Sequence, residues 1–221
     1  MAEGRDDVAE VVGRGHPRHR EQWGIEFSRI VAFSDGVFAI AITLLALTID
    51  FPQHLPPDQT VGELLESQTG AMLAYAISFA VLGKLWLAHH RFFSAVERFD
   101  GALMGLNLLY LAWVALIPVT SELLGDYGDD PVGVITYAIS MTGVTATFQL
   151  QILHATRRDL VRPELREMER RNAAPANLVI MSVFVLSIPV ALVSPLAATL
   201  MWPVIFLAGR RVGEWFGGLR A

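Results

Sequence analysis

Six long apolar segments constrain the fold of this 221-residue chain more than any other feature. Each spans roughly 18–24 residues, which as an α-helix is enough to cross about 30 Å of hydrocarbon. A chain in lipid must satisfy its own backbone hydrogen bonds, and a helix does so within one segment. The sequence therefore predicts an all-α integral membrane protein with six transmembrane helices, near residues 28–50, 71–90, 102–121, 132–155, 175–193 and 196–213.

Composition supports this class and excludes others. The chain is 53% hydrophobic and only 18% charged, whereas soluble domains are about a quarter charged. It contains no cysteine, which excludes disulfides, thiolate metal sites and cysteine nucleophiles. The net charge of −5 provides no basic surface for nucleic acid. The first apolar segment is too long for the core of a signal peptide, so we expect it to be retained.

The charged residues predict the orientation. All but one of the 17 basic residues lie in the N-terminal region, the second-to-third and fourth-to-fifth helix connections, or the C-terminal tail. The loops at 51–70 and 122–131 carry acidic residues and no Lys or Arg. The remaining base, Lys84, lies near the basic end of the second helix. Because basic loops stay in the cytoplasm, we expect a multi-pass protein of the bacterial plasma membrane with both termini cytoplasmic.

The chain divides into two parts. Residues 1–24 are polar and mixed in charge, and we interpret them as a mobile cytoplasmic segment. Residues 25–221 form one six-helix transmembrane domain surrounded by membrane lipids. The arginine-rich connection at 157–171 is expected to be a helical extension or a loop on the cytoplasmic face.

The first apolar helix has two different faces. At about 100° per residue, a stripe roughly 100° wide contains Ile40, Thr43, Leu44 and Leu47. Asp35 falls about 140° away from Ile40 on the same wheel. A carboxylate at that place must find partners inside the protein, because a buried charge without them is costly.

Several polar residues are predicted to lie at the level of Asp35 and to lock the helix in place. Arg29 is six residues earlier and so cannot pair with Asp35 along one helix. Either of the two adjacent histidines could join the network, but they point in different directions and lack an acidic partner, which disfavours a metal site. The predicted locking network comprises Arg29, Ser34, Asp35, Trp86, His89, His90 and Asn107.

Known catalytic and channel motifs are missing from the sequence. There is no Gly-x-Ser-x-Gly, no His-Glu-x-x-His and no phosphate-binding glycine loop, so an enzyme is not expected. There is no Thr-Val-Gly-Tyr-Gly filter and no arginine-repeat voltage sensor, which excludes a conventional potassium channel.

Three elements resemble a known family. They are Arg29-x-x-x-Phe33-Ser34-Asp35-Gly36, Trp86-Leu87-Ala88-His89-His90 and Asn107-Leu108-Leu109-Tyr110. Together they resemble the signature of the bacterial relatives of transmembrane protein 175, the endolysosomal potassium channel. The six-helix layout over residues ~25–215 is similar as well.

The resemblance implies a homotetramer in which the first helix of each subunit lines a central pore. It places a hydrophobic constriction at Ile40, Leu44 and Leu47, in place of a carbonyl filter, and an ion-selecting hydroxyl at Thr43. Rings of such apolar side chains can block ions by dewetting. The implied function is a potassium-permeable cation channel with modest selectivity for K⁺ over Na⁺, without cofactor and with monovalent cations as its only ligands.

Two other classes stay open from the residues alone. The first is a proton-coupled secondary transporter that uses Asp35 and His89 or His90, although no inverted repeat or broken helix accompanies them. The second is a membrane scaffold without transport. The intramembrane serines favour helix packing over a nucleophile, so an enzyme is the weakest alternative.

Overall fold

Every regular element that the computed structural model describes is helical. The described residues are 17–49, 52, 59–168 and 173–203, and one isolated β-bridge joins Val96 to Val161. In chain order the elements are α2 (Pro17–Leu44), the 3₁₀-helix η1 (Leu45–Thr48), α3 (Val61–Ser67), α4 (Thr69–Ala95), α5 (Gly101–Asp126), α6 (Pro131–Arg157), α7 (Pro163–Met168), α8 (Ala174–Ala191) and α9 (Pro195–Leu200).

Five of the six predicted membrane spans are confirmed as helices of sufficient length and hydropathy. They are Phe27–Thr48 within α2 and η1, together with α4, α5, α6 and α8. Only the start of the sixth, predicted at 196–213, lies among the described residues. It begins as α9, where the Ser194 side chain accepts a hydrogen bond from the Ala197 N–H.

Two boundaries differ from the prediction. The helix α2 begins at Pro17, so residues 17–24 of the predicted N-terminal segment are helical; residues 1–16 lie outside the described residues. Its α-helical part ends at Leu44 and continues as 3₁₀-helix, where an α-helix to residue 50 was expected. The Thr48 hydroxyl donates to the Leu45 carbonyl at 2.8 Å, an i to i−3 contact that suits the tighter winding.

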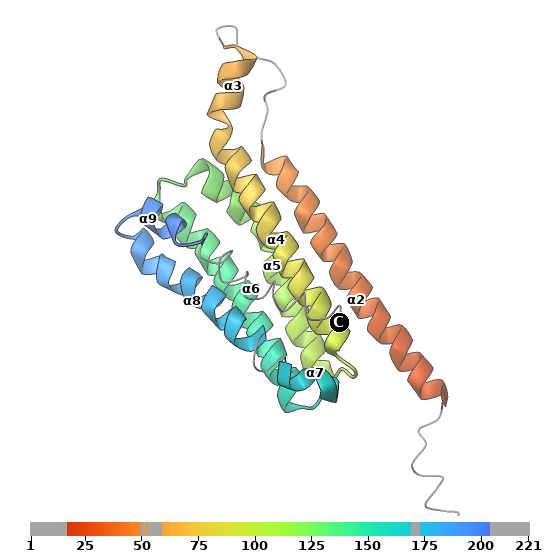
Figure 1. Cartoon of the computed structure of the whole chain (residues 1–221). Coiled ribbons are helices and arrows are strands. Elements are labelled where there is room, and N and C mark those ends of the chain that lie inside the picture. Colours follow the sequence, from red (N-terminus) through yellow and green to blue (C-terminus); the bar gives the residue numbers. More distant parts are fainter. Residues whose placement is uncertain (1–16, 50–51, 53–58, 169–172, 204–221) are drawn as a thin grey trace, which may run out of the picture.

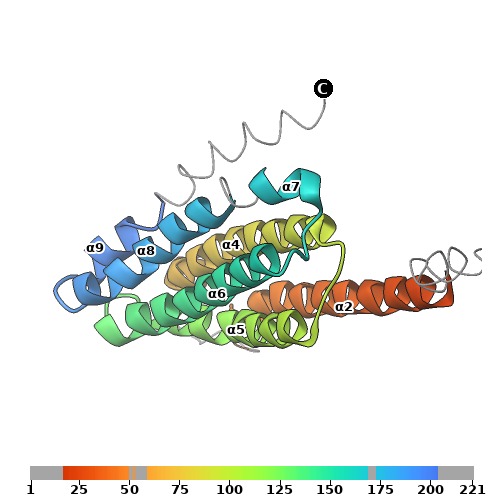
Figure 2. The same ribbon diagram turned by 90° about the horizontal axis from the view of Figure 1, so that it is seen from below.

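The helices run back and forth along one bundle axis, with α2 at one side and α8 at the other (Figures 1 and 2). The helix α2 packs against α4 and α5, while α6 lies between α5 and α8. One end of the bundle carries α3 and the 122–131 turn, and we call it the acidic end. The other carries α7 and the α4–α5 connection, and we call it the arginine-rich end.

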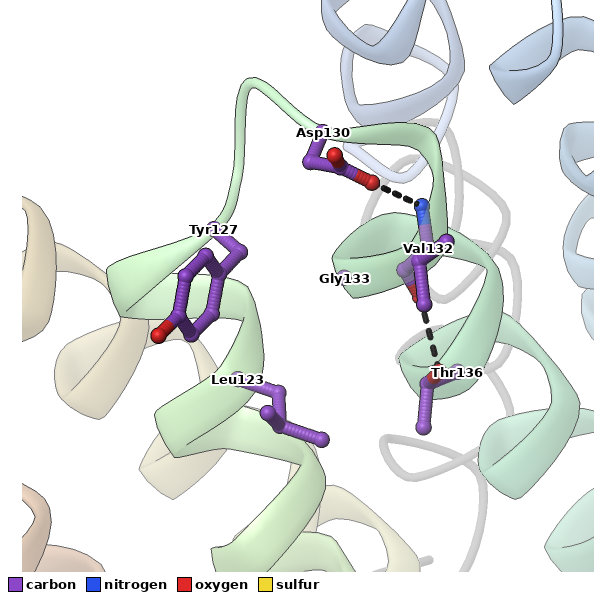
Figure 3. Close-up of a pocket in the computed structure, with 6 residues that line it drawn as sticks. All are labelled: Leu123, Tyr127, Asp130, Val132, Gly133 and Thr136. Carbon is purple, nitrogen blue, oxygen red and sulfur yellow. Dashed lines mark hydrogen bonds between the residues drawn. The ribbon is translucent and has the colours of Figure 1, made fainter.

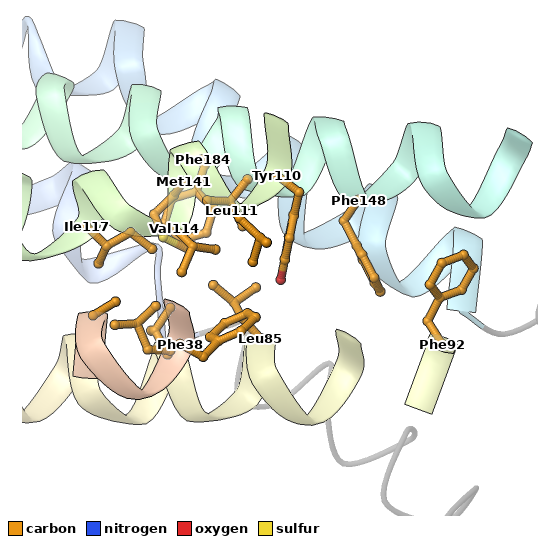
Figure 4. Close-up of a cluster of buried hydrophobic side chains, with 14 of the residues drawn as sticks. Phe38, Leu85, Phe92, Tyr110, Leu111, Val114, Ile117, Met141, Phe148 and Phe184 are labelled. Carbon is orange, nitrogen blue, oxygen red and sulfur yellow. The ribbon is translucent and has the colours of Figure 1, made fainter. Parts of the chain in front are cut away.

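The core joins α2 to the other helices through large apolar side chains (Figure 4). Phe38 of α2 and Leu45 of η1 are at most 1% exposed and belong to the same cluster as Tyr110 and Val114 of α5. The helices α5 and α6 pack closely at Gly143, where an added Cβ would lie 2.4 Å from the Trp113 ring. Glycine at that place lets the two helices close around the tryptophan.

The two ends of the bundle are tied by local contacts. At the acidic end, Thr60 and Glu63 form a capping box that starts α3. At the arginine-rich end, Asp159 has φ 55° just after α6, and its carboxylate pairs with Arg166 at 2.7 Å. The arginine-rich connection, expected to be a helical extension or a loop, contains the short helix α7.

Candidate functional site

One face of α2 has no partner in the part of the subunit that the structure describes. Ile40 is 61% exposed, Leu44 43% and Leu47 77%, and Thr43 is exposed beside them. On the opposite face Phe38 and Ala41 are buried. The structure therefore places all four predicted stripe residues together on the outer surface of the subunit.

The hydroxyl of Thr43 has a defined orientation. It lies 3.0 Å from the Ala39 carbonyl oxygen and 2.9 Å from that of Ile40, so its hydrogen donates back into the helix. A threonine bonded in this way keeps its oxygen lone pairs free on the outer side. Thr43 thus presents an acceptor oxygen in an otherwise apolar stripe.

The 3₁₀-helix η1 changes how the stripe continues past Leu44. With three residues per turn, residues i and i+3 eclipse each other. Leu47 therefore follows Leu44 along the same line, where an α-helix would offset it by about 60°. Leu45, which lies between them in sequence, is fully buried and anchors η1 against α4 and α5.

A chain of hydrogen bonds locks the other side of α2. His89 Nε2 lies 2.8 Å from Asn107 Oδ1, and Asn107 Nδ2 donates to Ser34 Oγ at 2.9 Å. The Ser34 hydroxyl donates in turn to the Ile30 carbonyl at 2.9 Å. Because Asn107 uses its amide N–H toward Ser34, its oxygen must accept from His89, which fixes the imidazole proton on Nε2. All three side chains are at most 1% exposed.

A second contact of the predicted network holds Asp35. Trp86 Nε1 donates to Asp35 Oδ1 at 2.8 Å, and the His90 ring lies against Trp86 with centroids 5.6 Å apart. The network therefore divides in two: His89 joins the buried chain, and His90 stays exposed beside the Trp86–Asp35 pair. Arg29 is exposed and makes no contact with these groups in the described part of the subunit.

The identity of the buried histidine was readable from helix periodicity. Leu85, His89 and Phe93 recur every four residues on the inner face of α4, and all three are buried. His90 instead follows Trp86 by one turn. A helical wheel of the second predicted helix therefore places His89, and not His90, on its buried face.

Other polar contacts were not predicted. Ser78 of α4 bonds Ser121 of α5 at 2.8 Å and Tyr137 of α6 at 3.3 Å, all in the core. At the arginine-rich end, His154 Nε2 lies 2.9 Å from Asp100 Oδ2. Partial burial tends to raise the pKa of Asp100, but hydrogen bonds from the Leu103 N–H and His154 outweigh it and leave the pKa below its ordinary value of 3.8.

A pocket of about 290 Å³ opens at the acidic end, away from α2 (Figure 3). Its polar contacts are local: Asp130 accepts from the Val132 N–H to cap α6, and Thr136 donates to the Val132 carbonyl. Among the described residues there is no group of three His, Cys, Asp or Glu that could hold a metal ion. The stripe on α2 and its supporting network are the arrangement best suited to a function.

Comparisons with known proteins agree with these features. Residues 29–118, which contain the stripe and every member of the network, match the family model "Endosomal/lysosomal potassium channel TMEM175". A potassium channel of Streptomyces collinus is 42% identical over 136 residues, which cover 60% of this chain and 66% of that protein. One of Chamaesiphon minutus is 42% identical over 139 residues, which cover 61% of this chain and 68% of that protein.

Solved structures and animal relatives extend the similarity. The crystal structure of a lysosomal potassium-selective channel TMEM175 homologue from Chamaesiphon minutus has a TM-score of 0.74 and 29% identity, covering 84% of this chain and 97% of that one. A mouse relative, 26% identical over 217 residues, is named an endosomal/lysosomal proton channel. This chain spans 42% of that longer protein. These relatives are named as channels, not as enzymes.

Proposed function

The chain belongs to the TMEM175 family of membrane channels, and on that premise we propose that it is a potassium-permeable cation channel. It works as a homotetramer in the bacterial plasma membrane, with both termini in the cytoplasm. The helix α2 of each subunit lines the central pore. Ile40, Leu44 and Leu47 form the constriction, and Thr43 contributes to ion selection.

The unpartnered stripe on α2 is the observation that carries this proposal. Its apolar members Ile40, Leu44 and Leu47 are exposed, whereas Phe38, Ala41 and Leu45 of the same continuous segment are buried in the subunit. A stripe that only faced lipid would gain nothing from a hydroxyl, yet Thr43 lies between Ile40 and Leu44. Four copies around an axis would place that oxygen beside the path of a cation.

The chemistry of the stripe suggests how ions are controlled. Rings of Ile40, Leu44 and Leu47 close the path by dewetting, because their apolar side chains cannot replace the water around an ion. The path conducts when the rings dilate or rotate. Thr43 offers an oxygen ligand to a partly dehydrated cation. A hydroxyl ring is a less complete cage than backbone carbonyls, so discrimination between K⁺ and Na⁺ is modest.

The buried network has a mechanical role in this proposal. His89, Asn107 and Ser34 fix the rotation of α2, as Trp86 does through Asp35. A buried polar chain has directional bonds and so holds one register more sharply than apolar contacts do. The stripe then faces the axis in every subunit.

Potassium flux into liposomes tests the function. The purified protein should conduct K⁺, and Ile40→Asn should raise the flux by on the order of tenfold because a polar ring hydrates the constriction. Ile139 of α6 is 46% exposed on another face, so Ile139→Asn is the matched control and should leave the flux unchanged. Thr43→Ala should reduce the preference for K⁺ over Na⁺.

Two results would count against the channel. One is a folded tetramer that passes no K⁺; the other is a flux that Ile40→Asn leaves at the wild-type rate. Native mass spectrometry gives the subunit number. Because the chain has no cysteine, Ile40→Cys introduces a single thiol, and disulfide formation between subunits reports whether these residues meet.

Proton passage is the second candidate, since the mouse relative is named a proton channel. The same liposomes under a pH gradient without K⁺ measure it directly. A proton flux that saturates and drives K⁺ uphill would instead indicate a coupled transporter acting through Asp35 and His89 or His90.

A further inference from the structure

Phe33 is an aromatic side chain of α2 without a partner in the described part of the subunit. It is 56% exposed and takes part in no ring contact there. The other phenylalanines of this helix behave differently. Phe27 stacks on Phe93 and Phe99, and Phe38 packs against His89 at 1% exposure.

The register of Phe33 places it on the proposed pore stripe. It precedes Ile40 by seven residues, which turns it by about 20° from Ile40 and sets it about 10 Å nearer the arginine-rich end. It lies on the same exposed side as Ile40, opposite Phe38. An aromatic ring on this line meets whatever enters the path from that end.

The side chains along the stripe are small between Phe33 and Ile40. The residue on the same line is Gly36, and a Cβ built there has no atom within 4 Å. Its exposed neighbour Ala39 is also small. In the tetrameric pore proposed above, small side chains between two bulky ones would leave a chamber with an aromatic edge on one side and the Ile40 constriction on the other.

We propose that this chamber is a binding site for bulky organic cations with apolar substituents, which block the channel from the arginine-rich end. The site rests on the tetrameric pore proposed above, because Phe33 from several subunits must surround the cation. Aromatic faces attract cations, including quaternary ammonium groups that cannot donate hydrogen bonds. The apolar walls then favour larger alkyl groups, so tetrapentylammonium should bind more tightly than tetraethylammonium.

Arg29 opposes cation binding at the same entrance. It lies one turn beyond Phe33 on the exposed side of α2. Its positive charge repels a cation on the way to the chamber, and salt screens that repulsion. Block should therefore strengthen in Arg29→Gln, with the larger gain at low ionic strength.

Inhibition of K⁺ flux by tetrapentylammonium, added to both sides of the liposomes, tests the site. We expect Phe33→Ala to weaken the block at least about tenfold and Phe33→Trp to retain it. Phe79 of α4 is 47% exposed, so Phe79→Ala is the matched control, and tetrapentylammonium should block it as strongly as it blocks the wild type. Equal block of wild type and Phe33→Ala, or no block of a conducting wild type, overturns the proposal.

A second measurement does not depend on conduction. Phe33→Cys carries the only thiol of the chain, and tetrapentylammonium should slow its reaction with a neutral maleimide in the purified protein, while Phe79→Cys reacts at an unchanged rate. Protection without any K⁺ flux would refute the channel but keep the site. Flux without protection would refute the site and keep the channel.

Discussion

Replacing Asn107 by leucine would remove the side chain that joins α4 to α2. The change keeps the number and branching of the side-chain heavy atoms but deletes two hydrogen bonds, at 2.8 Å to His89 and 2.9 Å to Ser34. The His89 Nε2–H is then left buried without an acceptor. Ser34 loses less, because its hydroxyl still donates to the Ile30 carbonyl.

The expected cost follows from these two losses. A stranded buried N–H costs about 1–3 kcal/mol, and the lost bond to Ser34 adds about 1 kcal/mol. The sum of about 2–4 kcal/mol corresponds to a drop of roughly 5–15 °C in Tm for a chain of this size. Thermal unfolding of the purified protein in detergent measures it.

A second substitution should restore most of this loss. Phenylalanine at position 89 can keep the stacking on Phe93 and Tyr110, whose ring centroids lie 4.5 Å and 5.3 Å from that of His89. Replacing both partners of a hydrogen bond by apolar groups of similar shape is nearly neutral. The double variant His89→Phe with Asn107→Leu should therefore be more stable than the sum of the single effects predicts, by about 1–3 kcal/mol.

A buried asparagine elsewhere provides the control. Asn177 of α8 donates to the Thr145 carbonyl and to Gln149 and touches no member of the network. Asn177→Leu should destabilise the protein, but its effect should add to that of His89→Phe. The reasoning fails if Asn107→Leu is neutral, or if its effect is also additive with His89→Phe.

Three further changes test other parts of the fold. Gly143→Ala should lower the stability by about 1–3 kcal/mol, because its Cβ would lie 2.4 Å from the Trp113 ring, and adding Trp113→Leu should recover part of the loss in a denaturation assay. Asp100→Asn should lower Tm at neutral pH but not in strong acid. Because the pKa of Asp100 is lower in the folded state than its ordinary value of 3.8, the charged carboxylate stabilises the fold at pH values above 3.8, and this contribution disappears as the pH falls through the folded pKa. A difference in Tm that persists unchanged in strong acid would contradict the assignment. Asp159→Gly should raise the stability by roughly 0.5–1 kcal/mol. At φ 55° a residue with a side chain is strained, and this strain exceeds the stabilisation from the exposed ion pair with Arg166. A measured loss of stability would mean that the ion pair contributes more.

The sequence predicted most of the span architecture because lipid imposes a simple rule on length and hydropathy. It also predicted the exposed stripe, since Ile40, Thr43 and Leu44 lie within one α-helical stretch where the angle per residue is constant. It did not predict the change to 3₁₀ winding at Leu45. That change depends on how Thr48 bonds Leu45, a local choice that hydropathy does not report.

The polar network was also predictable in part. Its residue types were predictable because buried polar groups must meet one another. Its pairing was not, because Asn107 can bond several neighbours and only the packing of α2, α4 and α5 decides which ones. The Asp100–His154 contact joins residues 54 positions apart, and no periodicity relates two helix ends across a loop.

The 3₁₀ winding of η1 determines how far the chain advances beyond Leu44 along the axis of α2. Four residues wound as 3₁₀ rise about 2 Å further than the same four wound as α. Leu45 is held in the core, so the near end of η1 is fixed and any rewinding must displace the far end. Such a rewinding would also turn Leu47 by about 60° relative to Leu44. The winding of one short segment therefore sets both the position of Leu47 along the helix axis and the direction in which its side chain points.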